Sequence, residues 1–113
     1  MTTLDTKNLD FLKNIDQKGK VIATYIWIDG AQGLRAKNRT LEKKVTSVSE
    51  LPGWNFDGSS CYMATTENSE IIMKPVSFYP DPFLLGDNIL VMCETYTWED
   101  TTYKNLVPAN TNF

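Results

Sequence analysis

Hydrophobic and polar residues alternate along the first third of the chain in the pattern of a β-hairpin. Residues 20–29 are mostly β-branched or aromatic in both registers, which predicts a strand that is apolar on both faces. Residues 29–33, Asp-Gly-Ala-Gln-Gly, have the composition of a turn, and alternation resumes over residues 34–41. The pattern therefore predicts two antiparallel strands joined by a turn longer than the tight two-residue kind.

Three cations share one register of the return strand. They are Arg35, Lys37 and Arg39. Side chains at every second position of a strand lie on one face of the sheet. We expect this face to be a solvated outer face, with contact to a subunit or an anion as the alternative.

The spacing of apolar residues elsewhere predicts one helix and further strands. Three- and four-residue spacing over residues 8–18, followed by Gly19, predicts a short amphipathic helix. Strands are predicted over residues 70–76, where Pro75 favours an edge strand or a strand end, and over residues 88–98. These elements indicate an α+β domain around one mixed or antiparallel sheet.

The remaining segments predict turns and loops. Pro80 and Pro82 bracket Asp81 in a rigid turn. Residues 61–70 are polar enough for a surface loop, and residues 104–113 show no periodicity and predict no element.

Composition excludes several classes of function. A chain of 113 residues fits one domain, and its net charge of −3 is too small and of the wrong sign for nucleic-acid binding. No apolar run approaches the ~20 residues that span a membrane, and the N-terminus does not resemble a secretion signal. The absence of histidine, with two cysteines that lack CxxC spacing, excludes zinc sites and histidine-based triads. Neither Gly19-Lys20 nor residues 29–33 match a nucleotide-binding loop.

Residues 51–60, Leu-Pro-Gly-Trp-Asn-Phe-Asp-Gly-Ser-Ser, combine turn residues with aromatics. In the structural interpretation, Gly58 takes a positive φ and Asp57 accepts hydrogen bonds from the amides that follow. In the functional one, Trp54 and Phe56 flank a partly dehydrated carboxylate that attracts a cation. The residues alone leave both interpretations open.

Several segments in order resemble one family. They are residues 25–30, 34–41, 50–60, 74–83, 86–91 and 111–112. This set is similar to the N-terminal region of eukaryotic (type II) glutamine synthetase, with a fungal character. The resemblance implies a β-grasp fold, a twisted mixed sheet with a small helical element. It also implies a helical arm over residues 1–20, the β-grasp domain over residues 21–104, and the start of a linker over residues 105–113.

The resemblance implies a cytoplasmic ligase of stacked homo-oligomeric rings that makes glutamine from glutamate, ammonium and ATP. It places ATP and Mg²⁺ or Mn²⁺ in a larger catalytic domain that we expect to be absent from this chain. We therefore expect no metal site, no cofactor and no activity from the chain alone. Its expected partners are glutamine synthetase subunits. An alternative is a free-standing β-grasp interaction module that tunes or poisons full-length rings.

By matching positions, the resemblance implies that Asp57 and Ser60 line the ammonium pocket of a neighbouring subunit. Trp54, Gly58 and Ser59 would support that pocket. An exposed aspartate, with a pKa of ~3.9, is a weak base, and we expect burial against Trp54 and the neighbour to raise it. The chain departs from the family at three places, which are Cys61-Tyr62-Met63, Leu84-Leu85 and Phe113. We expect the first departure to make the edge of the pocket more apolar.

Overall fold

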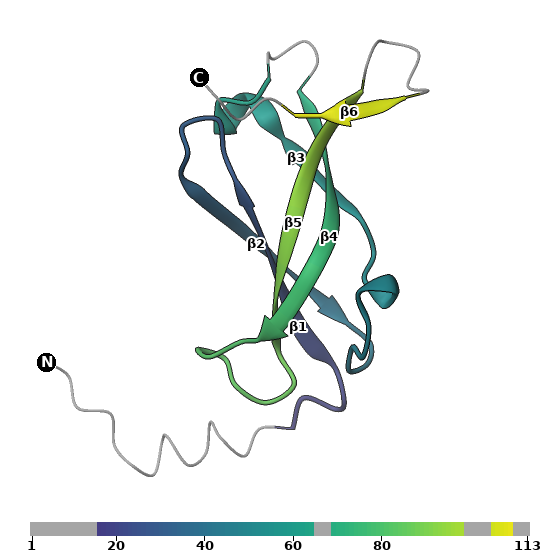
Figure 1. Ribbon diagram of the computed structural model, residues 1–113. Helices are drawn as coiled ribbons and strands as arrows, with labels where there is room; N and C mark the ends of the chain where they lie inside the picture. Colours follow the sequence, from purple (N-terminus) through teal and green to yellow (C-terminus); the bar gives the residue numbers. More distant parts are fainter. Residues whose placement is uncertain (1–15, 65–68, 99–104, 110–113) are drawn as a thin grey trace, which may run out of the picture.

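The computed structural model describes residues 16–64, 69–98 and 105–109 (Figure 1). The strands in these ranges are β1 (Val21–Ile28), β2 (Leu34–Leu41), β3 (Trp54–Asp57), β4 (Glu70–Pro80), β5 (Ile89–Trp98) and β6 (Leu106–Pro108). Two short 3-10 helices accompany them, η1 (Val48–Glu50) and η2 (Gly58–Cys61). Most of the helix predicted over residues 8–18 lies outside the described residues, and Lys18 and Gly19 form a turn.

The strands form one mixed sheet in the order β2-β1-β5-β4-β3. The predicted hairpin is confirmed, since β1 and β2 pair antiparallel from Val21 with Leu41 to Ile28 with Leu34. β1 also pairs with β5 in parallel, which makes the sheet mixed. β6 pairs antiparallel with the far half of β5, so the prediction that this part of the tail forms no element is wrong. Three residues are too few to show an alternating pattern.

Pro75 lies where β4 is paired on one side only. β4 lies between β5 and β3 in the strand order, but β3 pairs only with Glu70–Met73. The prediction of an edge position is therefore confirmed at Pro75, whereas a strand end there is wrong, because β4 continues to Pro80. The pairing with β5 shifts register between Pro75 and Ser77, as in a β-bulge. A bulge leaves a residue outside the regular ladder, and the missing N–H of proline therefore costs little there.

One face of the sheet forms the core. Alternate residues of β1 are buried, and β4 and β5 contribute to the same cluster; its fully buried larger side chains are Tyr25, Ile71, Met73 and Val91. The other register of β1 is half-buried or exposed, although it is also apolar. Cys61 and Met63 join the core, so the expectation that they line a pocket edge in a surface loop is wrong, while Tyr62 is exposed.

Candidate functional site: the Asp57–Ser60 turn

The predicted turn after Phe56 is confirmed, and Asp57 organises it. Asp57 ends β3 and caps η2: its Oδ1 accepts hydrogen bonds from the Ser59 amide at 2.9 Å and from Ser59 Oγ at 2.6 Å. Ser60 Oγ donates to the main-chain oxygen of Asp57 at 2.9 Å. An aspartate at this position satisfies amides that a short helix leaves without partners. The carboxylate and both serines are thus fixed relative to one another.

Gly58 is required for space and not for backbone conformation. It is buried and has no positive φ, so the predicted positive φ is wrong. A Cβ at this position would lie 2.5 Å from Ile71 Cγ1 and 3.0 Å from the Ala64 Cβ. Ile71 is itself fully buried, so the turn lies directly on the core.

Asp57 and Ser60 are exposed, and the predicted effect of burial on the pKa of Asp57 is not found in this chain. The hydrogen bonds from the side chain and then the amide of Ser59 lower the pKa of Asp57 below its usual value. Trp54 pairs with Met73 and lies on the core side, whereas Asp57 pairs with Glu70 on the other side of β3. The expectation that Trp54 buries this carboxylate is therefore wrong within this chain.

Trp54 packs against side chains of β1 and β2 instead. Its ring meets that of Tyr25 edge to face, with centroids 5.3 Å apart. Lys37 Nζ lies 3.7 Å from the centroid of the Trp54 ring, and the Arg39 guanidinium carbon lies 4.8 Å from it. Such cation–π contacts contribute ~0.5 to 2 kcal/mol each, depending on desolvation.

The cationic register of β2 faces inward, so the prediction of a solvated outer face is wrong. Its three side chains are half-buried, and each reaches a main-chain oxygen of residues 53–60. Lys37 Nζ donates to Asn55 O, Arg39 Nη1 to Gly53 O at 3.5 Å, and Arg35 Nη2 to Ser60 O at 3.5 Å. β2 and β3 are not neighbours in the sheet, and these side chains connect them.

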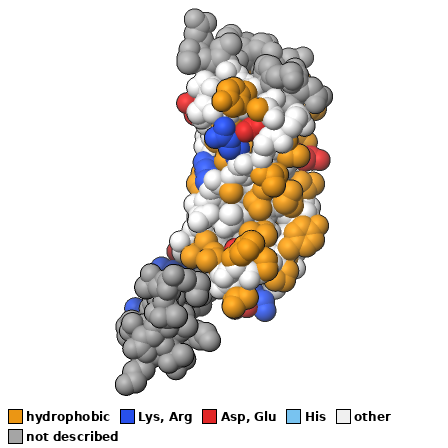
Figure 2. Space-filling model, turned by 90° about the vertical axis from the view of Figure 1, so that its left-hand side faces the viewer, with side chains coloured by type: hydrophobic (Ala, Val, Ile, Leu, Met, Phe, Trp, Pro, Cys, Tyr) orange, Lys and Arg blue, Asp and Glu red, His pale blue; other side chains and the backbone are white. Residues whose placement is uncertain are grey.

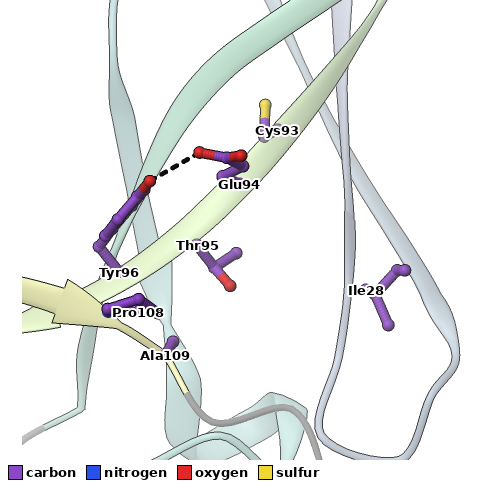
Figure 3. A pocket seen from close by; sticks show the side chains of 7 residues that line it. All are labelled: Ile28, Cys93, Glu94, Thr95, Tyr96, Pro108 and Ala109. Atoms are coloured by element: carbon purple, nitrogen blue, oxygen red, sulfur yellow. Dashed lines mark hydrogen bonds between the residues drawn. The ribbon is translucent and has the colours of Figure 1, made fainter.

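A separate hollow of about 340 Å³ lies between the end of β1, β5 and β6 (Figure 3). Its lining residues are Ile28, Cys93, Glu94, Thr95, Tyr96, Pro108 and Ala109. Tyr96 donates a hydrogen bond to Glu94 Oε2 at 2.6 Å, and burial raises the pKa of Cys93 to about 11. A thiol with such a pKa is a poor nucleophile at neutral pH. None of the predicted site residues lines this hollow.

Two general properties of the described residues bear on function. No group of three or more His, Cys, Asp or Glu side chains among them could hold a metal ion. In the same ranges, no helix is long and apolar enough to cross a membrane.

Comparison with known proteins gives the family. Residues 20–98 match the family described as "Glutamine synthetase, beta-Grasp domain". The chain is 52% identical over 100 residues to the glutamine synthetase of Tuber borchii, covering 88% of this chain and 28% of the relative. It is 54% identical over 100 residues to the glutamine synthetase of Emericella nidulans, which again covers 88% of this chain and 28% of the relative. A Drosophila melanogaster protein named "Glutamine synthetase 2 cytoplasmic" is 50% identical over 97 residues, 85% of this chain and 25% of that protein.

The chain thus spans little more than a quarter of the length of these relatives. The matched residues contain the whole sheet except β6, together with the Asp57–Ser60 turn. The curled mixed sheet with short helical elements agrees with the fold named in the family description. The chain belongs to the glutamine synthetase family, as its N-terminal β-grasp domain.

Proposed function

We propose that this domain serves the ATP-dependent formation of glutamine from glutamate and ammonium, by lending its Asp57–Ser60 turn to the ammonium pocket of a neighbouring subunit. The observation that carries the proposal is an exposed Asp57 carboxylate held in a fixed turn by Ser59. An exposed carboxylate, even one held in a fixed position, does not form a pocket by itself. A surface from a second subunit would enclose it.

The chemistry of Asp57 suits the binding of a cation. Ammonia is mostly protonated to ammonium near neutral pH. The lowered pKa of Asp57 keeps its carboxylate charged there. The same low pKa makes Asp57 a weak base in this chain alone. Desolvation by a neighbouring subunit is the physical effect that would raise the pKa and let the carboxylate accept a proton. We assign Asp57 to cation binding first, with Ser60, and give Trp54, Gly58 and Ser59 a supporting role.

ATP and the divalent metal belong, in this proposal, to the part of the enzyme beyond the matched segment. The described residues hold no cluster of metal ligands, and the sequence holds no nucleotide-binding loop. We therefore expect no activity from the chain alone. We propose a cytoplasmic location, because the Drosophila relative carries the word cytoplasmic in its name. The division at residues 20 and 104 stays a proposal.

A fusion enzyme tests the role of Asp57. This chain would replace the matching segment of the Tuber borchii glutamine synthetase, and Asp57→Asn would be compared with Asp87→Asn. Asp87 is an exposed carboxylate in a 3.6 Å ion pair with Lys44, so it controls for loss of a surface charge. We expect Asp57→Asn to raise the KM for ammonium ~10- to 100-fold, the equivalent of one charged hydrogen bond, with the KM for ATP unchanged. An unaltered ammonium KM would remove Asp57 from the pocket.

An exposed apolar surface favours a second candidate function, that of an interaction module for glutamine synthetase rings. Hydrophobic side chains gather in the lower part of Figure 2, the end where the β4–β5 turn lies, and Phe83, Leu84 and Leu85 of that turn are all exposed. Exposed apolar patches mark association surfaces. Mixing excess chain with the intact Tuber borchii enzyme should then change its activity or ring size. No change in either would reject this candidate.

A further inference from the structure

The buried side chain of Asp29 holds the β1–β2 turn together by hydrogen bonds. This residue is only 3% exposed. Its Oδ1 accepts hydrogen bonds from the amides of Ala31 at 2.9 Å and Gly33 at 2.8 Å, and its Oδ2 accepts one from Arg35 Nε at 2.8 Å. A buried carboxylate with this many donors is held rigidly, and it fixes Arg35 in turn.

The groups that Asp29 fixes are those that contact the candidate site. Arg35 Nη2 donates to Ser60 O at 3.5 Å, and the amide of Gly30 donates to Cys61 O at 2.9 Å. These two carbonyls belong to η2, whose first turn contains Ser59 and Ser60. The β1–β2 turn and η2 lie at the same end of the molecule in Figure 1. The Asp57–Ser60 turn is therefore held by the core beneath Gly58 and by this hairpin turn at its far end.

We propose that Asp29 and Arg35 are positioning residues that set the orientation of the Asp57–Ser60 turn for binding ammonium. The inference rests on the proposed function of that turn. The hydrogen bonds from Arg35 and from the Gly30 amide reach main-chain oxygens of η2, so Asp29 and Arg35 act on the Asp57–Ser60 turn through that main chain. The hairpin turn thus supports the Asp57–Ser60 turn in addition to joining β1 to β2.

The choice of variants follows from the burial of Asp29. Removing the Arg35 side chain would leave a buried carboxylate without its cation, which endangers folding. Arg35→Lys keeps the positive charge but loses the planar guanidinium that joins Asp29 to Ser60 O. Asp29→Asn keeps an oxygen acceptor for the turn amides and loses the charge. Lys20→Gln is the control, because it breaks an exposed ion pair with Glu42 at the end of the β1–β2 ladder opposite to the Asp29 turn.

The first measurement is amide hydrogen exchange, by NMR, in the 113-residue chain. Asp29→Asn and Arg35→Lys should speed exchange at least ~5-fold at the amides of Ser59 and Gly30, which donate to Asp57 Oδ1 and Cys61 O, with the β4–β5 ladder near Val91 unchanged. Lys20→Gln should change exchange at none of these amides. Unchanged exchange at Ser59 and Gly30 in both variants would overturn the inference.

The second measurement uses the fusion enzyme described above. Asp29→Asn should raise the KM for ammonium several-fold and leave the KM for ATP unchanged, and Arg35→Lys should be milder than Arg35→Gln. A general loss of stability would lower activity without this split between two substrates. If Asp57→Asn raises the ammonium KM and Asp29→Asn does not, the positioning role is overturned and the proposed function stands. If Asp57→Asn also leaves it unchanged, the proposed function fails, and the ammonium role inferred here fails with it.

Discussion

Trp27 stacks on Phe56, with ring centroids 4.3 Å apart and ring planes inclined by 23°. The two residues come from β1 and β3, which are separated in the sheet by β5 and β4. A contact between such strands requires the sheet to curl, so that its two ends approach each other. This curl brings the turn that follows Phe56 to the turn that follows Trp27. The candidate site and its support therefore depend on the curvature of the sheet.

Phe56→Leu should destabilise the chain by ~1 kcal/mol, because leucine keeps much of the apolar volume and loses the stacking interaction. Phe83→Leu is the matched control, since Phe83 is 85% exposed and should change stability by less than ~0.5 kcal/mol. Urea denaturation of the two variants gives the comparison. Equal losses would show that the stack adds nothing beyond burial.

The sequence predicted β1, β2 and β5 well. They have eight to ten residues each, enough for their β-branched and alternating pattern to show. β4 has eleven residues and continues to Pro80, beyond the predicted 70–76, because its prolines made its second half resemble a turn. β3 has only four residues, and the sequence predicts Trp54 and Phe56 as flanking the carboxylate of Asp57. In a strand, residues one apart lie on opposite faces. The aromatics therefore face the core while Asp57 faces out.

Gly58→Ala should destabilise the chain by ~1 to 3 kcal/mol, the usual range for overpacking. The added Cβ would lie 2.5 Å from Ile71 Cγ1, whereas a Cβ on Gly53 would meet only Met73 O at 3.4 Å. Gly53→Ala is therefore the control and should be nearly neutral. Thermal denaturation measures both. A neutral Gly58→Ala would show that Ile71 moves aside at little cost.

The candidate site was predictable in its residue types and not in its surroundings. Asp57 and its turn follow from local chemistry, because an aspartate accepts bonds from amides a few residues ahead. The inward direction of the cationic side chains on β2 does not follow from local chemistry. Alternation tells which side chains share a face, but it does not tell which face turns inward. The contact between Arg35 and Ser60 joins residues 25 positions apart and becomes visible only when the sheet curls.

Tyr25→Phe should cost ~1 to 3 kcal/mol, because it leaves the Pro52 carbonyl without its donor. The Tyr25 hydroxyl donates to Pro52 O at 2.6 Å from a fully buried ring, and burial raises its pKa, so it stays protonated at neutral pH. Tyr79→Phe is the control, since Tyr79 is exposed. Urea denaturation at pH 7 should separate the two variants. A loss no larger than that of Tyr79→Phe would mean that water replaces the hydroxyl.

Leu85→Asn should stabilise the chain by ~0.5 to 1 kcal/mol. Leu85 has φ at 60° and is 65% exposed, so it carries the strain of a left-handed backbone without burying its side chain. Asparagine adopts this conformation at lower cost. The variant should also self-associate less, as measured by sedimentation, since it removes an exposed apolar side chain. A lower melting temperature would show that Leu85 makes a stabilising contact.

Stability should fall at acid pH, partly because of Asp29. Hydrogen bonding to Arg35, and then to the Gly33 amide, lowers the pKa of Asp29 in the folded chain. The unfolded chain therefore binds more protons than the folded one near pH 4. The stability that Asp29 contributes is fully present above the ordinary aspartate pKa of ~3.9 and is lost as the pH falls through the lowered folded value.

Asp29→Asn removes this titration, so the difference in unfolding free energy between the wild-type chain and the variant should shrink as the pH falls from 7 to below 4. Urea denaturation across that range gives the two curves. The variant keeps one side-chain oxygen as an acceptor for the turn amides, and any part of the loss that does not depend on pH appears as a constant offset between the curves. Parallel curves would therefore contradict a lowered pKa of Asp29 in the folded chain.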